Sequence, residues 1–259
     1  MKEMHVYSGG KLMRGESEVV GEFPLVLRVN DREIVTLIAS PHDLRFLVAG
    51  FLRVQGFVSR VEDFLVLSVC NDYGIANVQI RGELPGELKP ILTSGCGTGI
   101  TFTLPGSGKL EKIAPNTERV APAAVFALMS ELALNSEKYK SHGGVHSAAV
   151  GDAQGTLLLH AEDIGRHNTF DRLAGEALLK GVDLGGRLLV TSGRVSAEMA
   201  AKAAALGIPL IASRTSPTDM AIKICEDAGI CLIGYLRGAR FNVYAHPELL
   251  SVEAEDAES

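Results

Sequence analysis

The sequence predicts a mixed α/β protein whose C-terminal half contains a parallel sheet covered by helices. The main observation is a regular alternation of apolar strand-like runs with helix-like runs over residues 188–235. Strands are predicted at 188–191, 209–212 and 230–235, and helices at 197–205 and 217–228. Strands joined through helices at this spacing pair in parallel, which predicts the α/β class.

The first 81 residues predict a smaller α+β part. Residues 1–20 are polar and predict a loose arm or an edge strand. Two β-hairpins follow, with strands at 24–29 and 33–38, and at 64–70 and 75–80. Between them Ser40 is the expected N-cap of a helix, with Pro41 at its first position, and Gly56 ends that helix.

The middle of the chain joins the two parts. Residues 84–122 are rich in Gly, Pro, Ser and Thr, and a long irregular segment in a compact protein is usually functional or disordered. We place the domain boundary here, with domains at 1–115 and 116–259. A helix at 125–134, a hairpin of strands at 147–150 and 156–160, and a helix at 168–180 complete the prediction.

Composition restricts the partners and the compartment. The 259 residues carry a net charge of −6, so the chain has no overall basic footprint for nucleic acid or an anionic membrane. No apolar run reaches the length of about 18 residues that a membrane helix needs. The four cysteines lack a disulfide framework spacing, which predicts free thiols and a cytoplasmic location.

Cys96 is the cysteine most suited to chemistry. It lies in the run Thr93-Ser94-Gly95-Cys96-Gly97-Thr98-Gly99, where no neighbour can pack against a buried thiol. The glycines allow backbone amides to approach the sulfur, which favours the thiolate. Cys70, Cys225 and Cys231 lie in apolar strands or a helix and are expected to be structural.

Four arginines are expected at strand ends and form the predicted basic face. Arg166 lies in Glu162-Asp163-Ile164-Gly165-Arg166-His167-Asn168, and Arg194 lies in a small polar turn whose amides suit an oxyanion. Arg237 and Arg240 follow the last predicted strand and suit a phosphate or pyrophosphate. Ordinary capped turns are the alternative for the first two segments, whereas the whole set predicts a phosphorylated ligand.

Two histidine motifs have weaker interpretations. One motif, His142-Gly143-Gly144-Val145-His146-Ser147, joins a helix to a strand. It is either a turn with one capping histidine or part of a site. His160-Ala161-Glu162 matches half of a zinc deaminase signature. The other half, Pro-Cys-x-x-Cys, is missing, so we expect no metal site.

At several of these segments the chain resembles the formate dehydrogenase accessory sulfurtransferases, the FdhD family. The resemblance extends from about Glu22 to His246, and the run from Glu162 to Asn168 is its most distinctive part. The other matching segments are Ser40-Pro41-His42-Asp43-Leu44, Ala49-Gly50-Phe51-Leu52, Gly143 to Ala149, Asp171-Arg172-Leu173, Ser192 to Ser196 and Gly234 to Tyr244.

The resemblance implies a specific fold and activity. It implies a cytidine-deaminase-like C-terminal domain without zinc, a smaller N-terminal part, and a homodimer. Family members take persulfide sulfur from a cysteine desulfurase and transfer it to the molybdenum or tungsten bis(guanine dinucleotide) pterin cofactor, which formate dehydrogenase needs for activity. The implied persulfide residue is Cys96, and the second cysteine of the family's turn is replaced by Gly99. The implied cofactor-binding residues are Tyr235, Leu236, Arg237, Gly238, Ala239 and Arg240.

Together these observations give one hypothesis and two rivals. In the hypothesis, Cys96 accepts a sulfane sulfur, the basic face holds the phosphates of the cofactor, and His167 or His146 moves a proton. The first rival is a cofactor-binding chaperone that transfers no sulfur, which Gly99 makes more credible. The second rival is a zinc-dependent deaminase.

Overall fold

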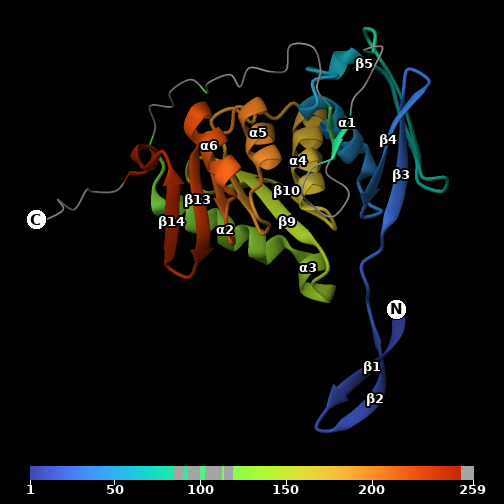
Figure 1. The fold of residues 1–259 in the computed structure, drawn as a ribbon, viewed down its shortest axis with the longest axis vertical. Helices are drawn as coiled ribbons and strands as arrows, with labels where there is room; N and C mark the ends of the chain where they lie inside the picture. The colour runs from blue at the N-terminus through green and yellow to red at the C-terminus, as the bar shows by residue number, and fades with distance from the viewer. Residues whose placement is uncertain (85–89, 93–99, 103–112, 114–118, 252–259) are drawn as a thin grey trace, which may run out of the picture.

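The computed structural model describes residues 1–84, 90–92, 100–102, 113 and 119–251. Its largest unit is a six-stranded sheet in the C-terminal half, with strand order β10-β9-β11-β12-β13-β14. Figure 1 shows helices on both sides of this sheet and a smaller sheet with its own helix beside it. The protein is therefore of the mixed α/β class, as the sequence predicts.

The middle of the large sheet confirms the predicted parallel arrangement. Strands β11 (Leu188–Thr191), β12 (Leu210–Ser213) and β13 (Cys231–Arg237) pair in parallel. The remaining strands pair antiparallel with their neighbours: β9 (His146–Gly151), β10 (Leu157–Asp163) and β14 (Arg240–Ala245). β14 is absent from the sequence prediction. Residues 235–240 therefore span the end of β13, a tight turn and the start of β14, and are not a free segment after a final strand.

Each face of the large sheet has its own helices. Helices α4 (Arg166–Lys180), α5 (Ala197–Ala205) and α6 (Asp219–Ala228) cover one face, and α2 (Pro122–Asn135) covers the other. Alternate residues of β11 face opposite layers: Leu189 packs in the core with α4 and α5, whereas Leu188 and Val190 pack in the core with α2. A short helix, α3 (Glu137–His142), follows α2.

The smaller sheet confirms both predicted hairpins. Its strand order is β4-β3-β6-β5, with strands β3 (Phe23–Val29), β4 (Arg32–Ala39), β5 (Phe64–Cys70) and β6 (Ile75–Ile80). Helix α1 (Leu44–Val54) packs against it, and a short 3-10 helix, η1 (Val61–Asp63), precedes β5. A second 3-10 helix, η2 (Pro247–Leu249), lies near the C-terminus.

The start of α1 corrects the sequence prediction. The helix begins at Leu44, and its N-cap is Asp43, which has a left-handed backbone. Ser40 is 2% exposed and its hydroxyl accepts a hydrogen bond from the backbone N–H of Ile164, 124 residues away. The Ser40 hydroxyl therefore binds a backbone group of the C-terminal part and does not cap α1.

The first residues form a hairpin of their own. β1 (Lys2–Ser8) and β2 (Lys11–Ser17) pair antiparallel over their whole length and join neither larger sheet. Figure 1 shows this hairpin projecting away from the rest of the protein. It is a regular element where the sequence predicts a loose arm or an edge strand.

The two parts meet at a close crossing of α1 and α4. A Cβ atom on Gly50 would lie 1.6 Å from the carbonyl oxygen of Asp171, and one on Gly175 would lie 1.9 Å from that of Phe46. The absence of both side chains lets the two helix backbones touch. This contact fixes the smaller sheet against the C-terminal part.

The middle segment contains one short antiparallel pair, β7 (Pro90–Leu92) with β8 (Ile100–Phe102). Cys96, Gly99 and the domain boundary at 115/116 lie outside the described residues, so that boundary and the cytidine-deaminase-like relationship stay predictions. Within the described part of the chain, no helix is both long and apolar enough to cross a bilayer.

Candidate functional site

A pocket of about 500 Å³ opens beside the ends of the central strands. Ser192 follows β11, Arg214 and Thr215 follow β12, and Arg237 ends β13. The carboxyl edge of parallel strands is the usual place for a ligand in an α/β sheet. We call this cavity the arginine pocket. Its lining is Tyr139, Gly143, Gly144, Val145, His146, Ser192, Arg214, Thr215 and Arg237.

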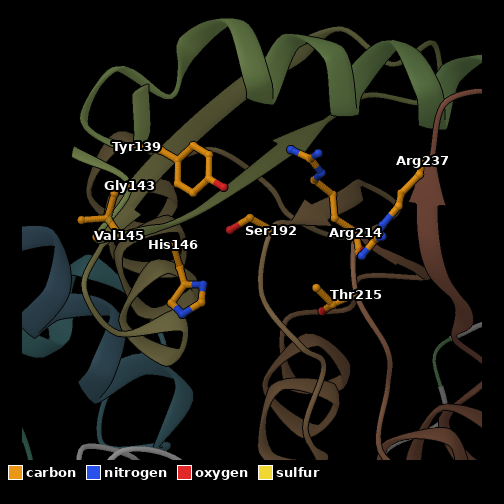
Figure 2. Close-up of a pocket in the computed structure, with 9 residues that line it drawn as sticks. Tyr139, Gly143, Val145, His146, Ser192, Arg214, Thr215 and Arg237 are labelled. Atoms are coloured by element: carbon orange, nitrogen blue, oxygen red, sulfur yellow. The ribbon is translucent and has the colours of Figure 1, made fainter. Parts of the chain in front are cut away.

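Two guanidinium groups give the arginine pocket its charge. Figure 2 shows the Arg214 and Arg237 side chains on the same side of the cavity, with His146 and Tyr139 across from them. The Nε of Arg237 donates a hydrogen bond to the carbonyl oxygen of Arg214 at 3.2 Å, which ties β13 to the turn after β12. A pair of arginines in a hollow suits a phosphate or pyrophosphate, because each guanidinium can donate two parallel hydrogen bonds.

Among the residues that the structure describes, only one of the four arginines of the predicted basic face lines the arginine pocket. Arg237 does so, whereas Arg194 and Arg240 are exposed elsewhere and Arg166 lies outside the lining. Arg214 takes the second place and was missed from the sequence. The sequence contains a signal for it: Arg214-Thr215 follows a strand that ends in Ser213, much as Ser192-Gly193-Arg194 follows the strand before it.

The turn after β11 does not offer the amides that the sequence predicts for an oxyanion. The N–H of Ser192 donates to the carbonyl of Ser147 at 2.9 Å, and the N–H of Gly193 donates to the Thr191 hydroxyl at 3.1 Å. The Ser213 hydroxyl in turn donates to the Gly193 carbonyl at 2.7 Å. Internal bonds occupy these groups, so side chains supply the positive charge of the arginine pocket.

The predicted cofactor segment divides into exposed residues and one core residue. Tyr235 is 41% exposed and has a positive φ of 53°, and Gly238 turns the chain with φ 57°. Ala239 is exposed, whereas the Leu236 side chain is 2% exposed and packs in the core with α2. Leu236 therefore has only its backbone to offer a ligand.

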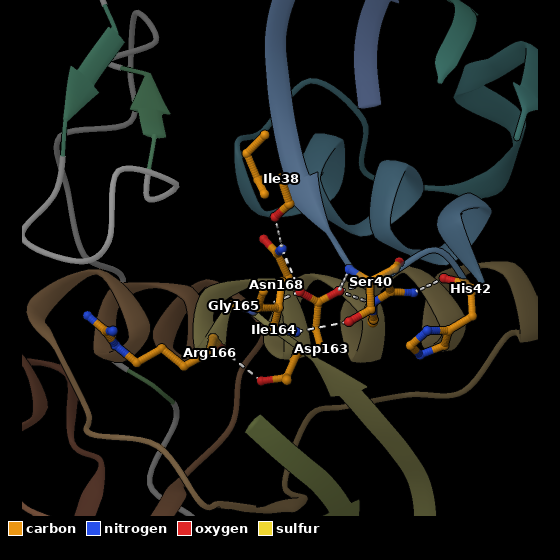
Figure 3. Close-up of polar contacts among 10 residues, drawn as sticks. Ile38, Ser40, His42, Asp163, Ile164, Gly165, Arg166 and Asn168 are labelled. Carbon is orange, nitrogen blue, oxygen red and sulfur yellow. Dashed lines mark hydrogen bonds and ion pairs between the residues drawn. The ribbon is translucent and has the colours of Figure 1, made fainter. Parts of the chain in front are cut away.

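The carboxylates of the Glu162-to-Asn168 run are structural. The Glu162 carboxylate accepts bonds from the backbone N–H groups of Lys138 at 3.0 Å and Tyr139 at 2.9 Å, which holds α3 in place. Asp163, fully buried, binds Arg172 and the backbone of Ser40 (Figure 3). Arg166 and His167 are the members of this run that remain for chemistry.

The two histidines proposed for proton transfer have different surroundings. His146 lines the arginine pocket, and its pKa is lowered by burial and by the nearby Arg166 guanidinium. It is therefore a neutral imidazole at pH 7. His167 lies deeper, 4% exposed, with its Nδ1 2.9 Å from the Oε2 of Glu198.

Two of the described cysteines differ from a reactive thiol. Cys225 in α6 and Cys231 in β13 are fully buried, and burial raises the pKa of each thiol to about 12. Both are protonated at neutral pH and unreactive, as their predicted structural role requires. Cys70 ends β5 and is half-buried.

A second pocket, of about 270 Å³, contains the zinc-like motif. His160 and Glu162 line it with His42, Lys138 and Arg172, where α1, α3 and α4 meet. The Glu162 carboxylate is engaged by the backbone amides of Lys138 and Tyr139. Among the described residues no three His, Cys, Asp or Glu side chains are grouped to hold a metal ion.

Comparison with known proteins gives consistent matches over nearly the whole chain. The profile of the FdhD/NarQ family matches residues 20–251. A protein of Bacillus subtilis (strain 168) named sulfur carrier protein FdhD is 34% identical over 252 residues, covering 96% of each chain. One of the same name from Staphylococcus aureus (strain JH9) is 32% identical, covering 93% of this chain and 92% of its own.

A solved structure shares the fold. The crystal structure of a putative formate dehydrogenase accessory protein from Desulfotalea psychrophila superposes with a TM-score of 0.79 at 29% identity. The superposition covers 96% of this chain and 98% of that chain.

Proposed function

Because this chain belongs to the FdhD/NarQ family, we propose that it is a sulfurtransferase that carries sulfur as a persulfide on Cys96. It takes the sulfur from a cysteine desulfurase and transfers it to the molybdenum or tungsten bis(guanine dinucleotide) pterin cofactor, on which formate dehydrogenase depends. The proposal includes a homodimer in the cytoplasm. Two relatives named sulfur carriers, matched over nearly their whole length, support the sulfur-carrying part.

Loading needs a thiolate and no added oxidant. The Cys96 thiolate attacks the outer sulfur of the desulfurase persulfide, a new S–S bond forms, and the desulfurase cysteine leaves as a thiolate. The product, Cys96–S–S⁻, is one sulfur atom heavier than the free thiol. The glycine-rich surroundings of Cys96 in the sequence favour this chemistry, whereas the buried Cys225 and Cys231 stay protonated.

The arginine pocket is the proposed site for the guanine dinucleotide. The single observation that carries this assignment is the pair Arg214 and Arg237 in one cavity at the carboxyl edge of the sheet. Their guanidinium groups would bind phosphate oxygens, and the exposed Tyr235, Gly238 and Ala239 lie on the same connection as Arg237. The neutral imidazole of His146, in the same cavity, would accept a proton as sulfur is transferred.

Intact mass tests the carrier residue. Incubation with a cysteine desulfurase and cysteine is expected to add one sulfur atom to the wild-type chain and none to Cys96→Ala. Cys70→Ala is the matched control, because Cys70 is a half-buried thiol at a strand end and is expected to leave loading intact. Loading of Cys96→Ala to the wild-type extent would refute the assignment.

Formate dehydrogenase maturation separates the sulfur carrier from the binding chaperone. As a carrier, the protein is expected to lose maturation activity in both Cys96→Ala and Arg237→Gln. Arg60→Gln, an exposed arginine before β5, serves as the control for the charge change. Full maturation by Cys96→Ala together with its loss in Arg237→Gln would favour the chaperone.

A further inference from the structure

Four buried polar atoms near the arginine pocket have no hydrogen-bond partner in the part of the chain that the structure describes. They are Nε and Nη2 of Arg166, Nε2 of His167 and Oγ of Ser196. His167 is 4% exposed and Ser196 is 6% exposed, so water does not satisfy them freely. Few buried polar atoms in native proteins are unpaired, and such a group often marks a place where a ligand binds.

These atoms belong to two helix N-termini that lie side by side. Arg166 and His167 form the first turn of α4, and Ser196 is the N-cap of α5. His167 reaches across to Glu198 in the first turn of α5, with its Nδ1 2.9 Å from Oε2. Gly193 brings the loop before α5 close, because a Cβ there would lie 3.0 Å from the Cβ of Arg166.

The first turn of α4 favours a negative charge beside Arg166. A guanidinium in the first turn lies at the positive end of the helix dipole, where a carboxylate would be preferred. The neighbouring carboxylates are engaged elsewhere: Asp163 with Arg172 at 2.6 Å, and Asp171 with Lys202 at 2.8 Å. The Glu198 carboxylate approaches His167 and, at 3.6 Å, Lys202.

The N-cap hydroxyl of α5 is also left without the bond that such a hydroxyl usually makes. In α6 the N-cap hydroxyl of Thr218 accepts a bond from the N–H of Ala221 at 3.2 Å. The Ser196 hydroxyl makes no such bond to the described residues, although it holds the same position in α5. Its hydroxyl proton therefore remains available to a ligand between the two helices.

We infer that Arg166, His167 and Ser196 form a binding site for one small anionic group next to the arginine pocket. The site adjoins that pocket through His146, whose Nδ1 would lie 3.4 Å from a Cβ on Gly193. Two sources supply the required chemistry: a phosphate of the nucleotide, or the terminal sulfur of a persulfide. The choice between these two sources rests on the proposed function. The existence of the anion site does not rest on it.

Inorganic phosphate is the probe for the site. Phosphate stabilises the folded chain that binds it, so it is expected to raise the melting temperature of the wild-type protein. Arg166→Gln is expected to weaken phosphate binding about tenfold or more, because charge-assisted hydrogen bonds are lost. Arg45→Gln is the matched control: Arg45 lies in the first turn of α1 but is exposed.

The free Arg166→Gln protein is expected to melt at the same or a higher temperature than the wild type, because two buried guanidinium nitrogens without a partner are removed. Ser196→Ala is expected to weaken phosphate binding by a smaller factor. No phosphate-dependent shift in the wild type would overturn the inference. Equal weakening by Arg45→Gln, or none by Arg166→Gln, would overturn it as well.

Two further titrations identify the source of the anion. If GDP displaces phosphate, a nucleotide phosphate occupies the site. If phosphate binds together with GDP and is displaced when desulfurase and cysteine load Cys96, the sulfur occupies it. Phosphate binding that neither treatment diminishes would overturn both sources. A failure of Cys96 loading would leave the phosphate and GDP results intact, so the two proposals fail separately.

Discussion

One buried carboxylate, Asp163, joins the two parts of the protein. Its Oδ1 accepts bonds from the N–H of Gly165 and the side chain of Asn168, both at 2.8 Å. Its Oδ2 accepts from the N–H of Ser40 at 3.2 Å and pairs with Arg172 at 2.6 Å. Figure 3 shows these bonds converging where the chain leaves β4. Arg172 extends the link by donating to the carbonyl oxygens of Ser40 and His42.

Replacing Asp163 with asparagine is expected to destabilise the whole fold. The change leaves Arg172, 3% exposed at its side chain, as a buried charge without its ion-pair partner. Breaking a buried pair in this way costs about 3–5 kcal/mol. Urea unfolding would measure the loss.

Glu3→Gln is the control for Asp163→Asn. It removes the same charge from an ion pair with Arg14, in which both side chains are more than half exposed. Exposed pairs are screened by water, so stability is expected to change little. A loss in Asp163→Asn no larger than in the control would contradict the structural role of Asp163.

At the residue scale, sequence reasoning finds the residues at junctions between elements but not their distant partners. The Glu162-to-Asn168 run is correctly placed at a strand-to-helix junction, and Arg237 lies at the end of a strand, where it lines a cavity. Ser40 looks like a helix cap because Pro41 and Asp43 follow it, yet its partners are more than 120 residues away. Local patterns do not contain such distant partners, so Ser40 was misassigned.

At the scale of elements, the α1–α4 crossing depends on paired glycines. A glycine inside a helix costs about 1 kcal/mol relative to alanine, so its presence there indicates a packing need. Gly50 and Gly175 meet that need by letting the helix backbones touch. Their positions were visible in the sequence, but the pairing of α1 with α4 was not.

Gly50→Ala tests the crossing. The added Cβ would lie 1.6 Å from the Asp171 carbonyl oxygen, so the helices must separate. Although alanine favours the helix itself, overpacking is expected to destabilise the protein by about 3 kcal/mol. Gly21→Ala is the control, because its Cβ would meet only Pro41 at 3.9 Å. A melting temperature of Gly50→Ala equal to that of the wild type would show that the two helix backbones do not touch.

The elements that the sequence missed share one property. β14 has one buried residue, and α3 has none over its six residues. Periodic burial is the signal from which strands and helices are read, so elements with little burial give little signal. The strands β11, β12 and most of β13 are buried continuously and were found within one or two residues.

At the scale of the whole molecule, three half-buried histidines couple the fold to pH. His42 and His160 line the second pocket between the two parts, and His146 lines the arginine pocket. Burial lowers the pKa of all three, with help from Arg172 at His42 and from Arg166 at His146. The folded protein therefore keeps these imidazoles neutral at a pH where the unfolded chain protonates them.

Stability is expected to fall as the pH drops from 7.5 to 5.5. In the unfolded chain these histidines take up protons near pH 6.5, so that state binds more protons and is favoured at lower pH. His246 acts in the opposite sense, because the Glu226 carbonyl and Glu248 raise its pKa. Asp171, whose pKa burial raises, also opposes the trend.

Comparing variants separates these contributions. His160→Gln removes one half-buried histidine while His246 and Asp171 stay. The loss of stability between pH 7.5 and 5.5 in urea unfolding is therefore expected to be smaller than in the wild type. His5→Gln, on the exposed β1, is the control and is expected to retain the wild-type pH dependence. If His160→Gln keeps the full wild-type dependence, the folded protein must protonate His160 as readily as the unfolded chain does. The pocket between the two parts would then be open enough to solvate a charged imidazole.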